Sequence, residues 1–244
     1  MLELRGVSKA FAGPVLRDVT LQVPKGCLYG LVGPGASGKS VLLKLLVGLL
    51  KPDAGRILVA GEDVTDLDEI QLHRVRQRFG FLFQNYALFD FLTVGENIAF
   101  PLRQLGLTDE DELVRRVAER LQAVALSGFE ARAPGGLSGG QKKRVGVARA
   151  TVTRAEVVLY DEPAAGLDPV TSQKIFDLLA REQREAGATV LMVSSDVARL
   201  LTVTDRVGML YKGRLIFDGT TEEALGSRHP VVKQFLHGEP DGPI

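Results

Sequence analysis

The sequence lacks several features that would indicate a secreted or nucleic-acid-binding protein. Its one cysteine, Cys27, cannot form an internal disulfide, and its place at the start of an apolar run predicts a small buried side chain. Thirty basic and thirty acidic residues leave no net charge. No overall attraction to nucleic acid is therefore expected, and we predict no nucleic-acid partner.

Long hydrophobic runs are absent as well. The most apolar stretch, residues 41–50, is interrupted by Lys44 and Gly48, and it is shorter than the roughly 20 residues that a membrane helix needs. No signal peptide precedes Leu2, which already begins a strand-like segment. These absences predict a cytoplasmic protein whose membrane role, if it has one, is peripheral.

The elements that are present predict an α/β fold. Apolar runs typical of buried parallel strands cover residues 27–32, 80–83, 156–160 and 189–194, and helical segments lie between them. Residues 2–23 alternate as antiparallel strands do. With 244 residues and 45% hydrophobic content, the chain can form one large domain. We expect a mostly parallel sheet core, an antiparallel β subdomain and an inserted α-helical subdomain.

We place the boundaries of these parts by composition. The core is expected in residues 1–84 and 151–225, the helical subdomain at about residues 85–150, and a C-terminal helix with an extended tail in residues 226–244. Local signals refine the helices and turns. They are a helix at residues 39–49, capping boxes at Thr93 with Glu96 and at Thr108 with Asp111, an N-cap at Asp168, and a hairpin turn at Lys212–Gly213.

A phosphate-binding motif follows the first buried strand. The pattern G-x-x-x-x-G-K-[ST] lies between a strand and a helix, where its backbone N–H groups can surround phosphates. Lys39 is expected to neutralise the β and γ phosphates, and the Ser40 hydroxyl is expected to coordinate Mg²⁺. The predicted nucleotide-binding residues of this segment are Gly33, Pro34, Gly35, Ala36, Ser37, Gly38, Lys39, Ser40 and Val41.

Two further motifs complete the predicted chemistry. Asp161 and Glu162 end an apolar strand; we assign Asp161 to Mg²⁺ and Glu162 to the attacking water as general base. The sequence LSGGQ at residues 137–141 opens a helix, and its N–H groups and hydroxyl can bind a second anion through Ser138, Gly139, Gly140 and Gln141. Two half-sites in one chain suggest a nucleotide shared between two chains.

The phosphate loop, LSGGQ and Leu159-Tyr160-Asp161-Glu162-Pro163 occur in an order that resembles the nucleotide-binding domain of an ABC ATPase, over nearly the whole chain. The resemblance implies a RecA-like P-loop NTPase fold, ATP and Mg²⁺ as ligands, and ATP hydrolysis. It also implies a head-to-tail dimer with a second copy, in which the LSGGQ of one subunit closes over the γ-phosphate held by the other.

The same resemblance assigns three more residues. Phe11 would stack on adenine, the alternative being a core aromatic. Gln84 would contact Mg²⁺ and the attacking water and report the nucleotide state to a membrane subunit; the alternative is a solvated loop glutamine. Asp168 would touch the opposite subunit's site, although it could serve only as an N-cap.

One position departs from the family pattern. Ser195 stands where the family usually has a switch histidine, and the three histidines of the chain, His73, His229 and His237, lie in unrelated segments. A serine hydroxyl can still donate a hydrogen bond toward the γ-phosphate, but it is shorter and carries no positive charge. We therefore list Ser195 as catalytic and hypothesise slower hydrolysis with ATP binding retained.

Residues 82–89, 92–94, 96–103, 232–238 and 241–243 resemble the ATPase subunit of Mla phospholipid-trafficking systems. That resemblance implies an MlaE-like permease, an MCE-domain lipid-binding protein and a small STAS-domain subunit as partners, and a place on the cytoplasmic face of the inner membrane. Three alternatives stay open. They are an importer ATPase for amino acids or another polar solute, a soluble ABC ATPase acting in iron–sulfur assembly or on nucleic acid, and a regulatory module that closes on ATP without useful turnover.

Overall fold

The computed structural model describes residues 1–244, which form two compact units. The first unit consists of Met1–Arg76 and Thr189–Ile244, and the second consists of Gln77–Ala188. The second unit is thus wider than the helical subdomain expected at about residues 85–150. It includes two strands besides the helices, so the acidic strand end and LSGGQ belong to the same unit.

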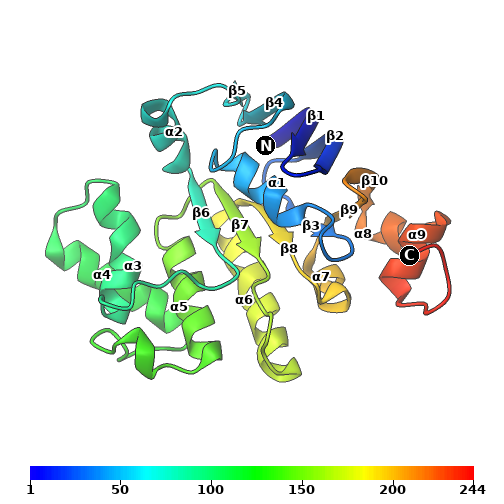
Figure 1. Ribbon diagram of the computed structural model, residues 1–244. Coiled ribbons are helices and arrows are strands. Elements are labelled where there is room, and N and C mark those ends of the chain that lie inside the picture. Colours follow the sequence, from blue (N-terminus) through cyan, green and yellow to red (C-terminus); the bar gives the residue numbers. More distant parts are fainter. The chain divides into compact units, whose positions relative to one another are not determined.

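The strands of the first unit form two groups (Figure 1). One is an antiparallel sheet in the order β2-β1-β4-β5; in the other, β10-β9-β3-β8, strand β3 runs parallel to both β8 and β9. Every residue of β3 and β8 is buried, as is typical of parallel strands covered on both faces. The bounds are β1 (Leu2–Ala10), β2 (Pro14–Val23), β3 (Leu28–Val32), β4 (Ala54–Val59), β5 (Glu62–Asp63), β8 (Thr189–Val193), β9 (Arg206–Tyr211) and β10 (Arg214–Thr220).

The helices of the first unit are α1 (Lys39–Leu46), α2 (Glu69–Arg76), α7 (Val197–Val203), α8 (Thr221–Leu225) and α9 (Pro230–His237). Helix α1 ends before the predicted end at Leu49, because Gly48 takes a left-handed conformation with φ +67° that stops the helix. The hairpin turn at Lys212–Gly213 is confirmed, since both residues have positive φ between β9 and β10. Cys27 is buried as predicted, and burial, with the nearby Asp205 carboxylate, raises the pKa of its thiol to about 11.

The C-terminal residues fold back on α9, whereas we expected an extended tail. Gln234 is buried, and its side-chain oxygen accepts a hydrogen bond from the Ile244 backbone N–H at 2.8 Å. Its amide nitrogen donates to the Glu239 carbonyl, and the Tyr211 hydroxyl donates to the Pro243 carbonyl. The tail bends because one buried amide has to satisfy both its donor and its acceptor locally.

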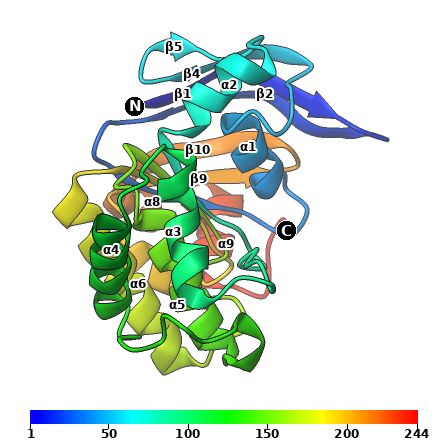
Figure 2. The same cartoon turned by 90° about the vertical axis from the view of Figure 1, so that its left-hand side faces the viewer.

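The second unit pairs two parallel strands, β6 (Phe79–Leu82) and β7 (Val157–Asp161), with helices. Helices α3, α4 and α5 contact one another and form a helical group (Figure 2). A Cβ at Gly80 would lie 2.0 Å from the Ala150 carbonyl oxygen, so only glycine allows β6 to approach α5 this closely. The bounds are α3 (Val94–Gln104), α4 (Glu110–Ala123), the 3₁₀ turn η1 (Pro134–Gly136), α5 (Gly139–Thr151) and α6 (Pro169–Ala186).

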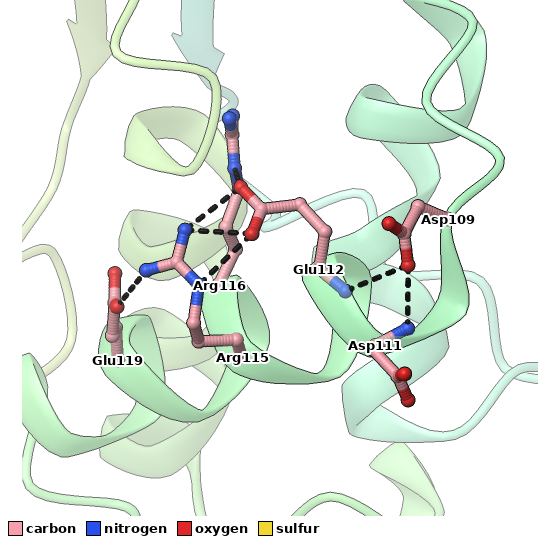
Figure 3. A network of polar contacts seen from close by, with 6 residues as sticks. All are labelled: Asp109, Asp111, Glu112, Arg115, Arg116 and Glu119. Carbon is pink, nitrogen blue, oxygen red and sulfur yellow. Dashed lines mark hydrogen bonds and ion pairs between the residues drawn. The ribbon is translucent and has the colours of Figure 1, made fainter.

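One of the two capping boxes predicted for the helices of this unit is present. Thr93 and Glu96 form the expected capping box of α3. The cap predicted at Thr108 is wrong, because the carboxylate of Asp109 accepts hydrogen bonds from the N–H groups of Asp111 and Glu112 instead (Figure 3). The carboxylate of Asp109 satisfies two N–H groups at once, and aspartate is at least as good an N-cap as threonine. No helix of either unit is both long and apolar enough to span a bilayer.

Candidate functional site

The predicted phosphate loop connects β3 to α1, and its lysine lies folded across it. Lys39 Nζ donates to the carbonyl oxygens of Gly33 at 2.7 Å and Pro34 at 2.9 Å. The ammonium group is therefore held over the loop by the loop's own carbonyls. Lys39, Ser40 and Val41 form the first turn of α1, whose N–H groups point out of the amino end of the helix.

Glycine is needed at both ends of this loop. A Cβ at Gly33 would lie 2.1 Å from the Leu210 carbonyl oxygen, and one at Gly38, which has φ +103°, would lie 2.5 Å from Leu16 Cδ2. Gly35 faces open space, with no heavy atom within 4 Å of a Cβ placed there. The loop is thus closely packed at Gly33 and Gly38 and open at Gly35. The open side has room for a phosphate group.

Phe11 follows the last residue of β1, and its ring is 59% exposed. This exposure rules out the alternative of a core aromatic. Lys9 Nζ lies 5.6 Å from the ring centroid. A hollow of about 460 Å³ is lined by β1 and β2 residues that include Ala10 and Leu16, the side chain that also abuts Gly38. An exposed ring and an open hollow in this unit leave room for a nucleobase.

Ser195 lies between β8 and α7 at an exposed corner. The hydroxyl of the buried Ser194 accepts a hydrogen bond from the Asp196 backbone N–H at 3.0 Å, and Asp196 caps α7 by accepting from the Arg199 N–H. The two flanking side chains are therefore used to build the corner. Ser195, which we predicted to stand in place of a switch histidine, is exposed.

In the second unit, the predicted catalytic residues leave β6 and β7 at the same end. These strands run parallel with Leu82 paired to Tyr160, so Gln84 and the pair Asp161–Glu162 follow the same edge. Gln84 is exposed, Asp161 is 7% exposed at the end of β7, and Glu162 is half-buried. The structure brings the strand ends that carry these residues together within this unit.

The backbone at Glu162 has an uncommon conformation. Its φ is +52°, in the left-handed region that a residue with a side chain seldom occupies. The Glu162 carbonyl oxygen accepts hydrogen bonds from Lys143 Nζ at 2.7 Å and from the Ala165 N–H at 3.3 Å. The turn after β7 is therefore fixed by a buried cation on α5.

The LSGGQ segment forms a reciprocal cap at the start of α5. The Gln141 N–H donates to Ser138 Oγ at 3.3 Å, and the Ser138 N–H donates to Gln141 Oε1 at 2.9 Å. Ser138 and Gly139 are exposed, and Gly140 is half-buried. Because the Ser138 hydroxyl accepts within the cap, its own hydrogen can point outward to an anion beyond the helix.

Asp168 is the N-cap of α6, as predicted, with Pro169 in the first helical position. Its carboxylate accepts from the N–H groups of Val170 at 3.0 Å and Thr171 at 2.9 Å. Hydrogen bonds from Thr171, and then from Val170, hold the pKa of Asp168 below its usual value. The charged form of Asp168 is therefore the one that stabilises the loop before α6.

The predicted site residues fall into two sets. Phe11, the phosphate loop and Ser195 belong to the first unit, and Gln84, LSGGQ, Asp161, Glu162 and Asp168 belong to the second. No group of three or more His, Cys, Asp or Glu side chains gathers as a metal site. The oxygen donors predicted for Mg²⁺, from Ser40, Gln84 and Asp161, are the hard ligands that this ion prefers, and it usually takes phosphate oxygens and waters as well.

Sequence reasoning missed two buried cations on α5. Lys143 is 1% exposed and Arg149 is 9% exposed. Arg149 donates to the carbonyl oxygens of Tyr86 and Ala87, just after Gln84. A signal was present, since Lys143 precedes Val147 and Ala150 by four and seven residues and so lies on the buried face of the helix.

Comparisons with known proteins show which family this chain belongs to. A protein-family profile described as ABC transporter matches residues 16–165. The chain is 42% identical over 244 residues to a probable ribonucleotide transport ATP-binding protein of Mycobacterium leprae, covering 100% of this chain and 70% of the relative. It is 40% identical over 234 residues to a methionine import ATP-binding protein of Caulobacter vibrioides, covering 95% of this chain and 70% of the relative.

Solved structures show the same fold. A dimeric ATP-binding cassette in a post-hydrolysis state, bound to ADP and Pi, superposes with a TM-score of 0.85 at 31% identity, over 91% of this chain and 99% of the other. CbiO1 from Clostridium perfringens, part of an ABC transporter complex, superposes with a TM-score of 0.84 at 28% identity, over 98% and 95% of the two chains.

Proposed function

Because this chain belongs to the ABC transporter family as an ATP-binding ATPase subunit, we propose that it powers phospholipid trafficking by closing as a dimer around ATP. The phosphate loop is the observation that best supports an ATP site. It is closely packed at Gly33 and Gly38 and open at Gly35, and the Lys39 ammonium is hydrogen-bonded across it. The P-loop NTPase fold predicted from the motifs is confirmed by the solved cassettes.

We assign the chemistry to residues on both units. Ser40, Gln84 and Asp161 would hold Mg²⁺, which would supply positive charge to the phosphate oxygens. Lys39 binds the β and γ phosphates. Glu162 accepts a proton from water as the water oxygen bonds to the γ-phosphorus; the bond to the β–γ bridging oxygen breaks, and ADP and phosphate leave.

The second copy of the chain would complete the site. Ser138, Gly139, Gly140 and Gln141 of one subunit would bind the γ-phosphate held by its partner, because exposed N–H groups at a helix start attract anions. Asp168 would contact the opposite site while it caps α6. Phe11 would stack on the adenine ring. Dimer closure around ATP would then move the helical parts of the two subunits and push the permease docked near Gln84.

Substitution of Glu162 tests the assignment of the general base. We expect Glu162→Gln to lower ATP turnover by at least about a hundredfold, while the variant still binds ATP and forms a closed dimer. Light scattering after gel filtration with ATP would detect the dimer, and phosphate release would give the rate. Full-rate hydrolysis by the variant would contradict the role of Glu162.

Ser195 tests the hypothesis of slow hydrolysis. The exposed serine hydroxyl provides one short donor where the family usually has an imidazole. We expect Ser195→His to raise turnover of the dimer, with ATP affinity unchanged. Ser195→Ala is the matched control and should lower turnover further or leave it low. No gain in the histidine variant would sink the hypothesis.

The lipid substrate rests on the resemblance of residues 82–103 and 232–243 to Mla-type ATPases. The proposal implies an MlaE-like permease, an MCE-domain protein and a small STAS-domain subunit as partners, and a location on the cytoplasmic face of the inner membrane. The names of the relatives favour a second candidate, transport of a ribonucleotide or of methionine.

Purifying the chain with its native membrane complex separates these candidates. Stimulation of ATP turnover by phospholipid vesicles, and co-purification of an MCE protein, would support the lipid proposal. Stimulation by methionine or a ribonucleotide, with a solute receptor in the complex, would overturn it. The Glu162→Gln complex serves as the control for turnover by contaminating ATPases.

A further inference from the structure

Helix α5 holds the backbone on which the general base is built. Lys143 points from the buried face of α5 and donates to the Glu162 carbonyl oxygen at 2.7 Å. Its ammonium also lies 5.3 Å from the centroid of the Tyr86 ring, within the range of a cation–π contact. The ammonium group thus joins a backbone carbonyl to a ring.

The hydrogen bond from Lys143 is made to a residue whose backbone conformation is energetically unfavourable. Glu162 has φ +52°, and a left-handed conformation at a residue with a side chain is costly unless its surroundings maintain it. The same carbonyl oxygen accepts a hydrogen bond from the Ala165 N–H, which closes the turn after β7. The Lys143 ammonium therefore adds a second hydrogen bond to the oxygen on which this turn depends. The φ and ψ angles of Glu162 set the direction in which its Cβ, and hence its carboxylate, leaves the backbone.

A second cation on α5 holds backbone carbonyls in the same way, in the loop that follows β6. Arg149 donates to the carbonyl oxygens of Tyr86 and Ala87, which have φ +60° and +49°. The Tyr86 side chain lies along α5, because a Cβ at Gly146 would be 3.8 Å from Tyr86 Cβ and one at Gly139 would be 3.8 Å from the Tyr86 hydroxyl. Tyr86 therefore runs from the middle of α5 to the LSGGQ segment.

We propose that Lys143 is a positioning residue that fixes the Glu162 carboxylate through the Glu162 backbone. This inference rests on the proposed function of Glu162. Its physical basis is that a buried ammonium holds the carbonyl of a residue in a left-handed conformation, as Arg149 does for Tyr86 and Ala87.

The test compares Lys143→Met with Lys142→Met, a change of the neighbouring half-buried lysine, because of these two lysines it is Lys143 that donates to the Glu162 carbonyl oxygen. We expect Lys143→Met to lower kcat by about 10- to 100-fold, as a small misplacement of a catalytic group does, with ATP affinity unchanged. Lys143→Gln keeps a donor for the carbonyl and should recover part of the rate. Wild-type kcat in Lys143→Met, or an equal loss in Lys142→Met, would overturn the proposal.

Two further measurements separate positioning from general destabilisation. In the Glu162→Gln background, Lys143→Met should have almost no further effect on the residual rate, because the group that it positions is gone; the same fold loss in both backgrounds would overturn the proposal. Hydrogen exchange of the Ala165 N–H should be faster in Lys143→Met, and unchanged exchange there would also overturn it. Failure of the proposed function itself would appear separately, as full-rate hydrolysis by Glu162→Gln alone.

Discussion

Helices α4 and α5 belong to the same unit, and the exposed arginines of α4 act differently from the buried cations of α5. On α4, Arg115 pairs with Glu112 at 2.7 Å and with Glu119, and Arg116 pairs with Glu112 at 2.7 Å (Figure 3). These pairs are three or four residues apart and face water. On α5, Lys143 and Arg149 are buried and bind carbonyl oxygens 19 and 62 residues away in sequence.

The difference follows from solvation. Water screens the exposed pairs of α4, so each contributes little and affects only its own helix. A buried cation loses its water and has to be satisfied by the protein, so the groups that satisfy it are held firmly. Arg115 and Arg116 of α4 therefore act within one helix, whereas Lys143 and Arg149 of α5 determine where two other segments lie. The largely buried Arg120 of α4 follows the second pattern, because it pairs with Glu182 on α6.

Removing Arg149 should have the largest effect on stability. Arg149→Met leaves the Tyr86 and Ala87 carbonyls without their buried donor, and we expect a loss of about 2–4 kcal/mol, or about 5–12 °C in Tm. Differential scanning calorimetry would measure it. Arg149→Lys is the matched control and should lose less, because its ammonium keeps a buried cationic donor for at least one of the two carbonyls. A change within about 1 °C in the methionine variant would break the contrast between α5 and α4.

The loss of stability on removing the Thr93 cap of α3 should lie between the loss expected for the buried cations of α5 and that for the exposed ion pairs of α4. Thr93→Ala removes the hydroxyl that accepts from the Glu96 N–H at the start of α3, with an expected cost of about 1 kcal/mol, or about 2–4 °C in Tm. Thr93→Ser keeps the oxygen and should restore most of the loss. A fall in Tm as large as that of Arg149→Met would show that burial is not what distinguishes strongly stabilising polar groups from weakly stabilising ones.

The cap of α6 gives a pH-dependent effect. Since hydrogen bonds from Thr171 and Val170 lower the pKa of Asp168 in the folded protein, its stabilisation is fully present above the unfolded pKa and is lost as pH falls through the lowered folded pKa. Asp168→Asn keeps a capping oxygen without titrating. The Tm difference between the two proteins should therefore be largest near neutral pH and shrink in acid. A difference that grows in acid would contradict the assignment.

The ion pairs of α4 should have the smallest effect. We expect Arg115→Ala to change Tm by less than about 1 °C, although Arg115 contacts two carboxylates. Whatever difference remains should disappear in 0.5 M salt, because the pair is exposed and screening at about that concentration reaches a few ångströms. A loss comparable to that of Thr93→Ala would show that the surface network of α4 is cooperative.

Local signals in the sequence were enough to locate much of the fold and of the site. The strand, loop and helix around residues 33–38, the caps at Thr93 and Asp168 and the Lys212–Gly213 turn are confirmed, because each depends on residues within a few positions of one another. The capping-box pattern of Thr108 with Asp111 predicts the wrong N-cap for α4, because the adjacent Asp109 also accepts well and the two residue types differ little in capping energy.

The interactions that sequence did not reveal join distant segments. Lys143 and Arg149 bind carbonyl oxygens, which every residue has, so nothing in the composition of the partner segments marks them. Their loops also adopt left-handed conformations at Glu162, Tyr86 and Ala87, none of which is glycine. The backbone shape there is imposed by packing on α5, and residue type alone gives no sign of it.

The ring of Phe11 bears on which nucleotide the protein consumes. It offers an exposed apolar face without a hydrogen-bonding group. Stacking on such a face tolerates any base, because every base has a π-surface. If stacking is the main contact with the base, guanine would bind about as well as adenine. The relative abundance of the two triphosphates in the cell, rather than the ring, would then decide which one is hydrolysed.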